Sequence, residues 1–143
     1  MEAALEMLEL VLERADPRPA SESLTLVFEL RRRARLRTRL DSGREIGLLI
    51  ERGLSLRHGD RLATRDGRLV VEVRAKPELL STVQTSDPHL LTRAAYHLGN
   101  RHVPLQVGEG FLRYLRDHVL DAMVLEHGLA VLAEEAPFEP ENG

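Results

Sequence analysis

The sequence predicts an α+β fold: a small all-β domain over residues 1–76, followed by a βαββαβ domain over residues 77–143. Apolar residues in the first half recur mostly at every second position, as in half-buried strands, whereas two stretches of the second half have helical spacing. The net charge also differs between the two halves: residues 31–76 carry +8 and residues 77–143 carry −6. We therefore place a domain boundary near Lys76-Pro77, where a proline follows a strand-like run.

Alternating apolar residues predict the strands of the first domain. They are Leu24, Leu26, Phe28 and Leu30, then Leu36 and Leu40, then Ile46, Leu48 and Ile50. Turn residues separate these runs: Asp41-Ser42-Gly43-Arg44 predicts a hairpin, His58-Gly59-Asp60 a break, and Asp66-Gly67 a two-residue hairpin in which both residues take positive φ. The first residues of the chain fit both helical and strand spacing, so periodicity does not decide between a helix and a strand there.

The second domain begins with a predicted strand at residues 79–85. Asp87 then caps a helix with Pro88 at its first position, and Gly99 ends it in the left-handed conformation. The apolar stripe of this helix is Leu90, Leu91, Ala94, Ala95 and Leu98. Alternation next predicts a strand over residues 103–107, a turn at residues 108–110, and a returning strand over residues 111–115.

A second helix completes the domain. Asp117 caps it, Gly128 ends it, and its predicted apolar stripe is Val119, Leu120, Met123 and Val124. A final strand over residues 129–133 and a short acidic tail after Pro137 follow. The order βαββαβ is that of a ferredoxin-like domain, in which two helices pack on one face of an antiparallel sheet.

Composition excludes several classes of protein. The absence of cysteine removes disulfides, thiolate metal sites and cysteine nucleophiles, which leaves imidazole and carboxylate as metal ligands. We find no GxSxG motif and no phosphate-binding loop, so we expect no enzyme. No apolar run approaches the ~20 residues of a membrane helix and the amino-terminal stretch is acidic, so we expect a soluble cytoplasmic protein without membrane association.

Arginine is concentrated at positions 31, 32, 33, 35, 37 and 39. On a strand, Arg35, Arg37 and Arg39 share one face. It is either a solvated face or an edge that charge protects from aggregation, or it is a docking face for an acidic protein partner or a nucleic-acid backbone. Nucleic acid is the weaker option as partner, because aromatic residues make up only 3% of the chain. Arg33, Arg35, Arg37 and Arg39 are the candidate partner-binding residues.

Three histidines are candidate metal ligands. His97 lies in the last turn of the first predicted helix, His102 follows that helix, and His118 opens the second. The other three, His58, His89 and His127, are interpreted as structural or surface residues, His127 because a helix C-terminus favours partial positive charge. Neither HxH nor HExxH is present, so spacing alone is a weak metal signal.

A family resemblance adds to this reading. The run from Tyr96 to Gln106, centred on Gly99-Asn100-Arg101-His102, resembles the signature of the UreE family of urease accessory proteins, which are nickel metallochaperones. The resemblance extends over nearly the whole chain. It continues through Leu112-Arg113-Tyr114, Asp117-His118-Val119-Leu120 and Pro137-Phe138-Glu139-Pro140-Glu141, and backwards through Asp87-Pro88, Arg52-Gly53-Leu54 and Asp41-Ser42-Gly43-Arg44.

The resemblance implies a β domain that binds peptides or partners, with a strand from about Met7, and a ferredoxin-like domain that binds metal and forms a homodimer. His102 matches the family's interface ligand and His118 a peripheral ligand. Some relatives have a further histidine where this chain has Arg116, which weakens such a peripheral site. The implied cargo is nickel, with zinc or copper also able to bind, and the implied partners are the urease apoprotein and the urease accessory GTPase complex.

The hypothesis from the sequence is therefore a nickel carrier in which a two-fold axis brings two copies of His102 to one ion. His97 supports or orients that ligand. Because imidazole must be neutral to bind, we expect affinity to fall below about pH 6.5. The main rival is a docking module for urease maturation that binds no metal, and a second rival is an RNA binder that uses the arginines.

Overall fold

A computed structural model describes residues 5–142 of the chain. The chain forms two compact units whose boundary lies between Lys76 and Pro77. Both units combine helices with β-sheets, so the predicted α+β class is confirmed. No helix among the described residues is long and apolar enough to span a membrane.

Two sheets build the first unit. One has the order β1 (Met7–Leu8), β5 (Glu45–Leu49), β4 (Arg35–Arg39), and the other β2 (Leu10–Val11), β6 (Arg61–Ala63), β7 (Val70–Ala75), β3 (Glu22–Leu26). The β1–β5 and β3–β7 pairs are parallel and the others antiparallel. Both sheets contribute to one core, in which Leu24, Ile46, Leu48, Leu62 and Val71 are fully buried. The alternation in the sequence therefore corresponds to one inward face on each sheet.

The strand predicted through Phe28 and Leu30 is wrong at its carboxyl end. These residues form α1 (Phe28–Arg31), a single helical turn that begins after Val27. Arg31, expected in an exposed arginine strand, is instead fully buried. Its guanidinium donates to the carbonyl oxygens of Leu26 and Leu56, each at 3.1 Å. These bonds satisfy the buried charge through carbonyl groups distant in sequence, which periodicity cannot reveal.

Glycines with positive φ close two turns of this unit. Gly43, at φ 93°, lies in the predicted hairpin between β4 and β5. Gly67 has φ 74°, but the expected two-residue Asp66-Gly67 hairpin is wrong, because Asp66 does not have positive φ. The backbone closes instead from Thr64 to Leu69, where Thr64 N donates to Leu69 O at 3.1 Å. The Asp66 carboxylate accepts from Thr64 Oγ1 and therefore stabilises a longer loop.

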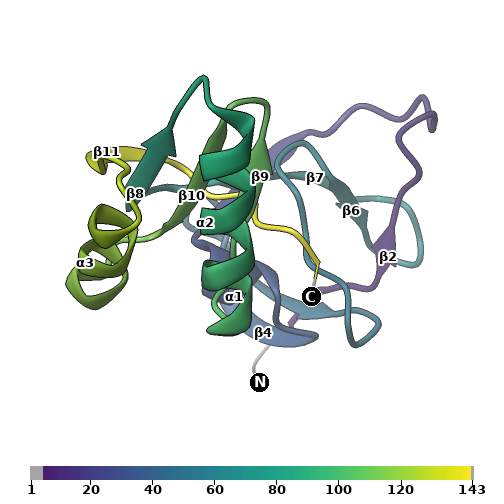
Figure 1. Cartoon of the computed structure of the whole chain (residues 1–143). Coiled ribbons are helices and arrows are strands. Elements are labelled where there is room, and N and C mark those ends of the chain that lie inside the picture. Colours follow the sequence, from purple (N-terminus) through teal and green to yellow (C-terminus); the bar gives the residue numbers. More distant parts are fainter. Residues whose placement is uncertain (1–4, 143) are drawn as a thin grey trace. The chain divides into compact units, whose positions relative to one another are not determined.

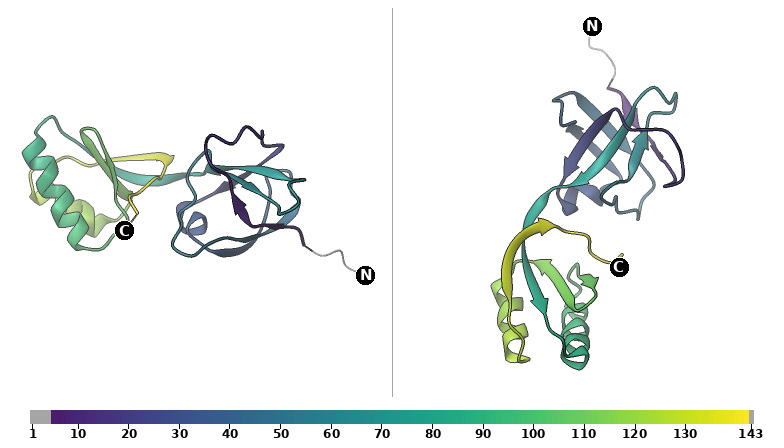
Figure 2. Two further views of the ribbon diagram at one scale, coloured as in Figure 1. Left: turned by 90° about the vertical axis from the view of Figure 1, so that its right-hand side faces the viewer. Right: turned by 90° about the horizontal axis from the view of Figure 1, so that it is seen from above.

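The second unit is ferredoxin-like. It contains β8 (Pro77–Gln84), α2 (Pro88–Asn100), β9 (Gln106–Gly108), β10 (Phe111–Leu115), α3 (His118–Glu126) and β11 (Leu132–Pro137). All pairs in the sheet β11-β8-β10-β9 are antiparallel. Figure 2 shows both helices on one side of this sheet, and the buried residues of sheet and helices form one core. The strands of the βαββαβ unit thus take the order 4-1-3-2.

Aspartates start both long helices, as predicted. Asp87 Oδ1 accepts from the backbone N–H of His89 and Leu90, and Asp117 Oδ1 from those of Val119 and Leu120. Each carboxylate satisfies two N–H groups that a helix start otherwise leaves unpaired.

Three other element predictions of this unit are corrected. Val119, predicted in the buried stripe of α3, is 56% exposed, so the stripe starts at Leu120. The strand expected over residues 103–107 is limited to β9, because Val103 and Leu105 pack on the core outside a strand. The last strand begins at Leu132 rather than at residue 129.

The segment after β11 is fixed to its own unit. Glu139 N donates to the side-chain oxygen of Gln106 at 3.0 Å, and Glu141 N donates to Leu105 O at 2.8 Å. Phe138 is fully buried. The acidic tail expected after Pro137 is therefore an ordered part of the second unit.

Candidate metal-binding site

His102 follows the carboxyl end of α2 in an uncommon backbone conformation. Its φ is +56°, and it is the only non-glycine residue among residues 5–142 with positive φ. Its N–H donates to Gly99 O at 3.0 Å, which closes the last turn. The side chain is exposed, and within the described chain its imidazole has no hydrogen-bond or ion-pair partner. His102 thus presents an open donor nitrogen at a strained position.

Gly99 does not end the helix as predicted. The helix continues through Asn100, Arg101 is its C-cap, and the left-handed position falls on His102. A Cβ placed on Gly99 would meet no atom of residues 5–142 within 4 Å, and the residue is exposed. Neither backbone conformation nor packing within the chain requires glycine at this position.

His97 pairs with a histidine that sequence analysis assigned no role in a site. Its ring stacks on the ring of His127, the C-cap of α3, with centroids 4.3 Å apart and 17° between planes. Tyr96 contacts His97 edge-on at 5.3 Å. The structure therefore joins His97 to His127 rather than to His102. No local signal in the sequence indicates this pair, because the two histidines lie at the ends of different helices, 30 positions apart.

His118 is the first residue of α3 and is exposed. Arg116, which stands where some relatives have a histidine, lies 3.9 Å from Asp121 Oδ2. His118, His97 and His102 do not come together. Among residues 5–142 no group of three or more histidines, cysteines or acidic residues is placed to hold a metal ion. A metal ion bound to one of these three histidines would therefore need further donor atoms from other molecules.

A buried polar cluster lies beneath α3. Asp121 Oδ1 accepts from Ser81 Oγ at 2.7 Å and from the Tyr114 hydroxyl at 2.6 Å. Burial, together with the bond to the Asp121 carboxylate, raises the pKa of Tyr114 well above its ordinary value. The phenol therefore stays a hydrogen-bond donor at any physiological pH. The cluster fixes α3 to β8 and β10.

Three of the candidate partner-binding arginines lie on β4. Arg35, Arg37 and Arg39 are exposed, and Glu45 on β5 pairs with both Arg37 and Arg39, at 3.3 and 3.2 Å. Arg33 is exposed in the segment between α1 and β4. The face therefore carries more positive than negative charge.

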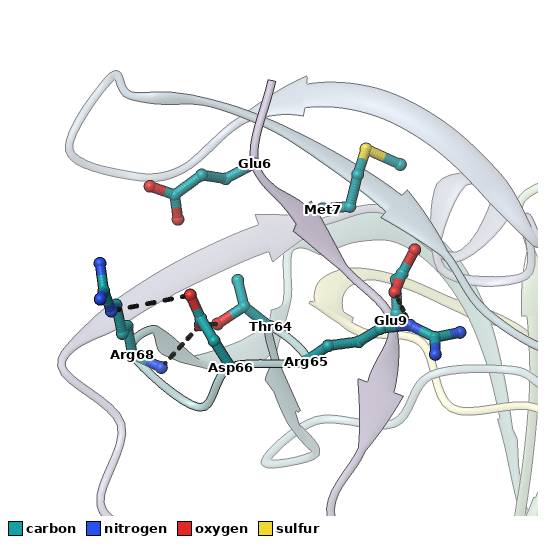
Figure 3. A pocket seen from close by; sticks show the side chains of 7 residues that line it. All are labelled: Glu6, Met7, Glu9, Thr64, Arg65, Asp66 and Arg68. Atoms are coloured by element: carbon teal, nitrogen blue, oxygen red, sulfur yellow. Dashed lines mark hydrogen bonds and ion pairs between the residues drawn. The ribbon is translucent and has the colours of Figure 1, made fainter. Parts of the chain in front are cut away.

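The first unit also has an open hollow of about 370 Å³ beside β1. Figure 3 shows its lining residues, which are Glu6, Met7, Glu9, Thr64, Arg65, Asp66 and Arg68. Glu9 pairs with Arg65, and Asp66 with Arg68. The third acidic lining residue, Glu6, pairs with Arg44, so each carboxylate of the hollow has an arginine partner.

Comparison with known proteins identifies the family. Residues 6–76 match the family described as UreE urease accessory protein, N-terminal domain, and residues 78–143 match its C-terminal domain. The chain belongs to the UreE urease accessory protein family. The boundary between the two UreE domains falls where the two structural units divide.

Relatives named urease accessory protein UreE are similar over most of the chain. One from Pseudomonas putida (strain W619) is 61% identical over 85% of this chain and 75% of its own length. One from Alkalilimnicola ehrlichii is 56% identical over 87% of this chain and 76% of its own length. One from Citrobacter koseri is 50% identical over 96% and 90%. These relatives are named as accessory proteins, not enzymes, and membership of the UreE family supports a role in urease maturation.

Proposed function

We propose that this protein is a cytoplasmic nickel carrier, without catalysis of its own, that holds one ion between the His102 side chains of two subunits. It delivers the ion to the urease apoprotein, with the urease accessory GTPase complex as a further partner. The observation that carries the proposal is His102 itself: an exposed, unpartnered imidazole at a left-handed backbone position. Such strain concentrates at functional sites, because elsewhere a glycine removes it.

A shared site explains why the single chain has so few ligands. One surface imidazole binds a divalent ion weakly, and no described group of three ligands completes a site within the chain. A two-fold axis repeats every residue across the interface and so doubles the ligand number. Imidazole suits nickel, copper and zinc, so these residues do not select nickel by themselves. Few protein ligands leave coordination positions open, which favours transfer of the ion to the next protein.

The outer surface of α2 near His102 is the proposed dimer interface. Gly99 lies on the exposed surface of the last turn of α2, where glycine is a weaker helix former than alanine by up to about 1 kcal/mol. Nothing within the chain requires it, but close approach of a second backbone would. Tyr96, one turn earlier, is 66% exposed, and aromatic residues are enriched in interfaces. We therefore place Tyr96 and Gly99 against the partner subunit.

The other candidate residues have lesser roles in this proposal. The stack with His127 orients His97, so His97 is a positioning residue at the end of α2. His118 offers a peripheral single-imidazole site, because it is exposed and belongs to no group of three ligands among the described residues. Delivery also requires docking, which we assign to Arg33, Arg35, Arg37 and Arg39.

Calorimetric titration with nickel tests the proposal. We expect about one ion per two chains in the unmodified protein, as a two-fold axis requires, and loss of this binding in His102→Ala. His89→Ala is the matched control, because His89, at the start of α2, is an exposed histidine like His102 and should leave the isotherm unchanged. An unchanged isotherm in His102→Ala would overturn the assignment. Absence of nickel binding in the unmodified protein would favour the docking module without metal.

A further inference from the structure

Strand β4 lies at the edge of its sheet. In the order β1-β5-β4 it has a single strand neighbour among the described residues, and it is labelled in Figure 1. An edge strand has a row of N–H and C=O groups that face away from the sheet. A second extended chain can form backbone hydrogen bonds with these groups.

The outward backbone groups belong to the arginines. Ile50 N donates to Ala34 O at 2.8 Å and Leu40 N to Arg44 O at 2.9 Å, so the even-numbered residues of this strand bond to β5. Backbone groups alternate between the two sides of an antiparallel strand. Arg35, Arg37 and Arg39 therefore direct their N–H and C=O groups to the free edge. No backbone bond to these groups occurs within residues 5–142.

The same three residues carry the positive side chains. They point to one face of the sheet at two-residue intervals, about 7 Å apart. The side chains of Arg37 and Arg39 are 71% and 66% exposed, and Glu45 alone neutralises part of their charge. A strand added beside β4 would place every second side chain directly opposite an arginine.

Apolar side chains lie next to the arginines on this face. Leu49, opposite Arg35 on β5, is 39% exposed. Gly47, opposite Arg37, lies under the side chain of Met7, whose sulfur would clash with a Cβ at that position. This face of the sheet therefore combines a row of arginines with exposed apolar side chains. A face that only contacts solvent does not need the apolar side chains.

We infer that the free edge of β4 binds an extended acidic segment of a partner protein by strand addition, with acidic side chains at alternate positions opposite Arg35, Arg37 and Arg39. This inference names the mode of docking for the proposed accessory function and rests on that function's docking step, but not on nickel. Backbone bonds would supply affinity and the alternating charges would supply register and specificity.

A nucleic acid fits these features less well than a peptide. A phosphate backbone could pair with the guanidinium groups, but it has no alternating N–H and C=O groups to bond to the strand edge. No aromatic residue lies on β4 or β5 to stack against bases. The alternative in which the arginines only protect the edge from aggregation predicts no peptide binding at all.

The test uses the metal-free full-length protein and a fluorescent heptapeptide, Glu-Thr-Glu-Val-Glu-Thr-Glu. We expect saturable binding by fluorescence anisotropy that weakens about tenfold or more in Arg37→Glu. Arg68→Glu is the matched control, since Arg68 is an 88% exposed arginine in a turn of the other sheet of the unit and should bind normally. The same peptide methylated on the central glutamate nitrogens keeps its charge, loses its backbone donors, and should not bind.

Amide hydrogen exchange gives a second readout. The amides of Arg35, Arg37 and Arg39 should exchange fast in the free protein and slowly with peptide, while Leu36 and Thr38 are protected in both. Equal binding of the methylated peptide, absence of this protection, or tighter binding of a uridine oligonucleotide would overturn the inference. Because Arg37→Glu should leave the nickel isotherm unchanged, failure of the inference and failure of nickel carriage are distinguishable.

Discussion

At the scale of single residues, His102 combines the proposed metal-binding imidazole with a left-handed backbone conformation. The left-handed conformation costs a non-glycine residue about 1–2 kcal/mol, and His102 has φ +56°. Glycine at this position would remove that cost and also the imidazole. We therefore predict that His102→Gly is more stable to urea than His102→Ala by about 1 kcal/mol, while both variants lose the shared nickel ion. Equal stability of the two variants would show that the strain is absent in solution.

The buried Asp121 cluster gives the second residue-scale prediction. Tyr114→Phe removes one of the two hydroxyl donors to Asp121 Oδ1 and leaves a buried carboxylate with fewer partners. We expect the free energy of unfolding to fall by about 1–3 kcal/mol. Ser86→Ala, which removes an exposed hydroxyl, is the control and should have little effect on unfolding. Similar urea midpoints for the two variants would contradict the structural role of the cluster.

At the scale of elements, α2 should carry the dimer contact. Gly99→Gln improves helix propensity and meets open space within the chain, so it should not destabilise the subunit. It should nevertheless separate the dimer, measured by sedimentation velocity, and abolish the shared ion although His102 is intact. Ala122→Gln places the same side chain on an exposed position of α3 and should remain dimeric. A dimeric Gly99→Gln protein would move the interface elsewhere.

The turn between β4 and β5 is fixed to β3 by a carboxylate. Asp41 accepts hydrogen bonds from Ser23 Oγ at 2.6 Å and from Thr25 Oγ1 at 2.8 Å. Partial burial acts to raise the pKa of Asp41, but these bonds outweigh it and lower the pKa below its ordinary value. Its contribution to stability is therefore complete above the unfolded-state pKa and is lost as pH falls through the lower folded-state pKa.

Asp41→Asn should accordingly make the free energy of unfolding less dependent on pH between about pH 5 and pH 2. Glu51→Gln, an exposed carboxyl in the same unit, serves as the control and should keep the slope of the unmodified protein. Urea unfolding at several pH values measures both slopes. A slope in Asp41→Asn as steep as in the unmodified protein would show that the turn contributes nothing to acid stability.

Local signals in the sequence predicted most of these elements. Aspartate caps and apolar spacing located α2 and α3 because their causes lie within a few residues. Two of the errors had causes distant in sequence. Phe28 and Leu30 lie in a helical turn instead of a strand, and Arg31 in that turn donates to the carbonyl oxygen of Leu56. His97 stacks on His127, which lies thirty positions later in the chain. Tertiary contacts of this kind override local pattern.

At the scale of the whole molecule, each unit has its own core and its own sheets. The core of the first unit lies within residues 8–73 and that of the second within residues 83–131. Every strand pair of the described chain belongs to one unit or the other. β7 ends at Ala75 and β8 starts at Pro77, so a break after Lys76 removes no strand pairing. Segments that bury their own apolar residues in this way meet the physical requirement for independent folding.

We therefore predict that residues 1–76 and 77–143, expressed separately, both fold and divide the two proposed activities between them. The second fragment should dimerise and bind about one nickel ion per two chains, whereas the first should bind the acidic heptapeptide with the affinity of the full-length protein. Dispersed amide NMR spectra would report folding, and calorimetry and anisotropy would report binding. If the second fragment folded but did not bind nickel, the shared site would need residues of the first unit. The proposal that the two His102 side chains of a dimer suffice to bind the ion would then be wrong.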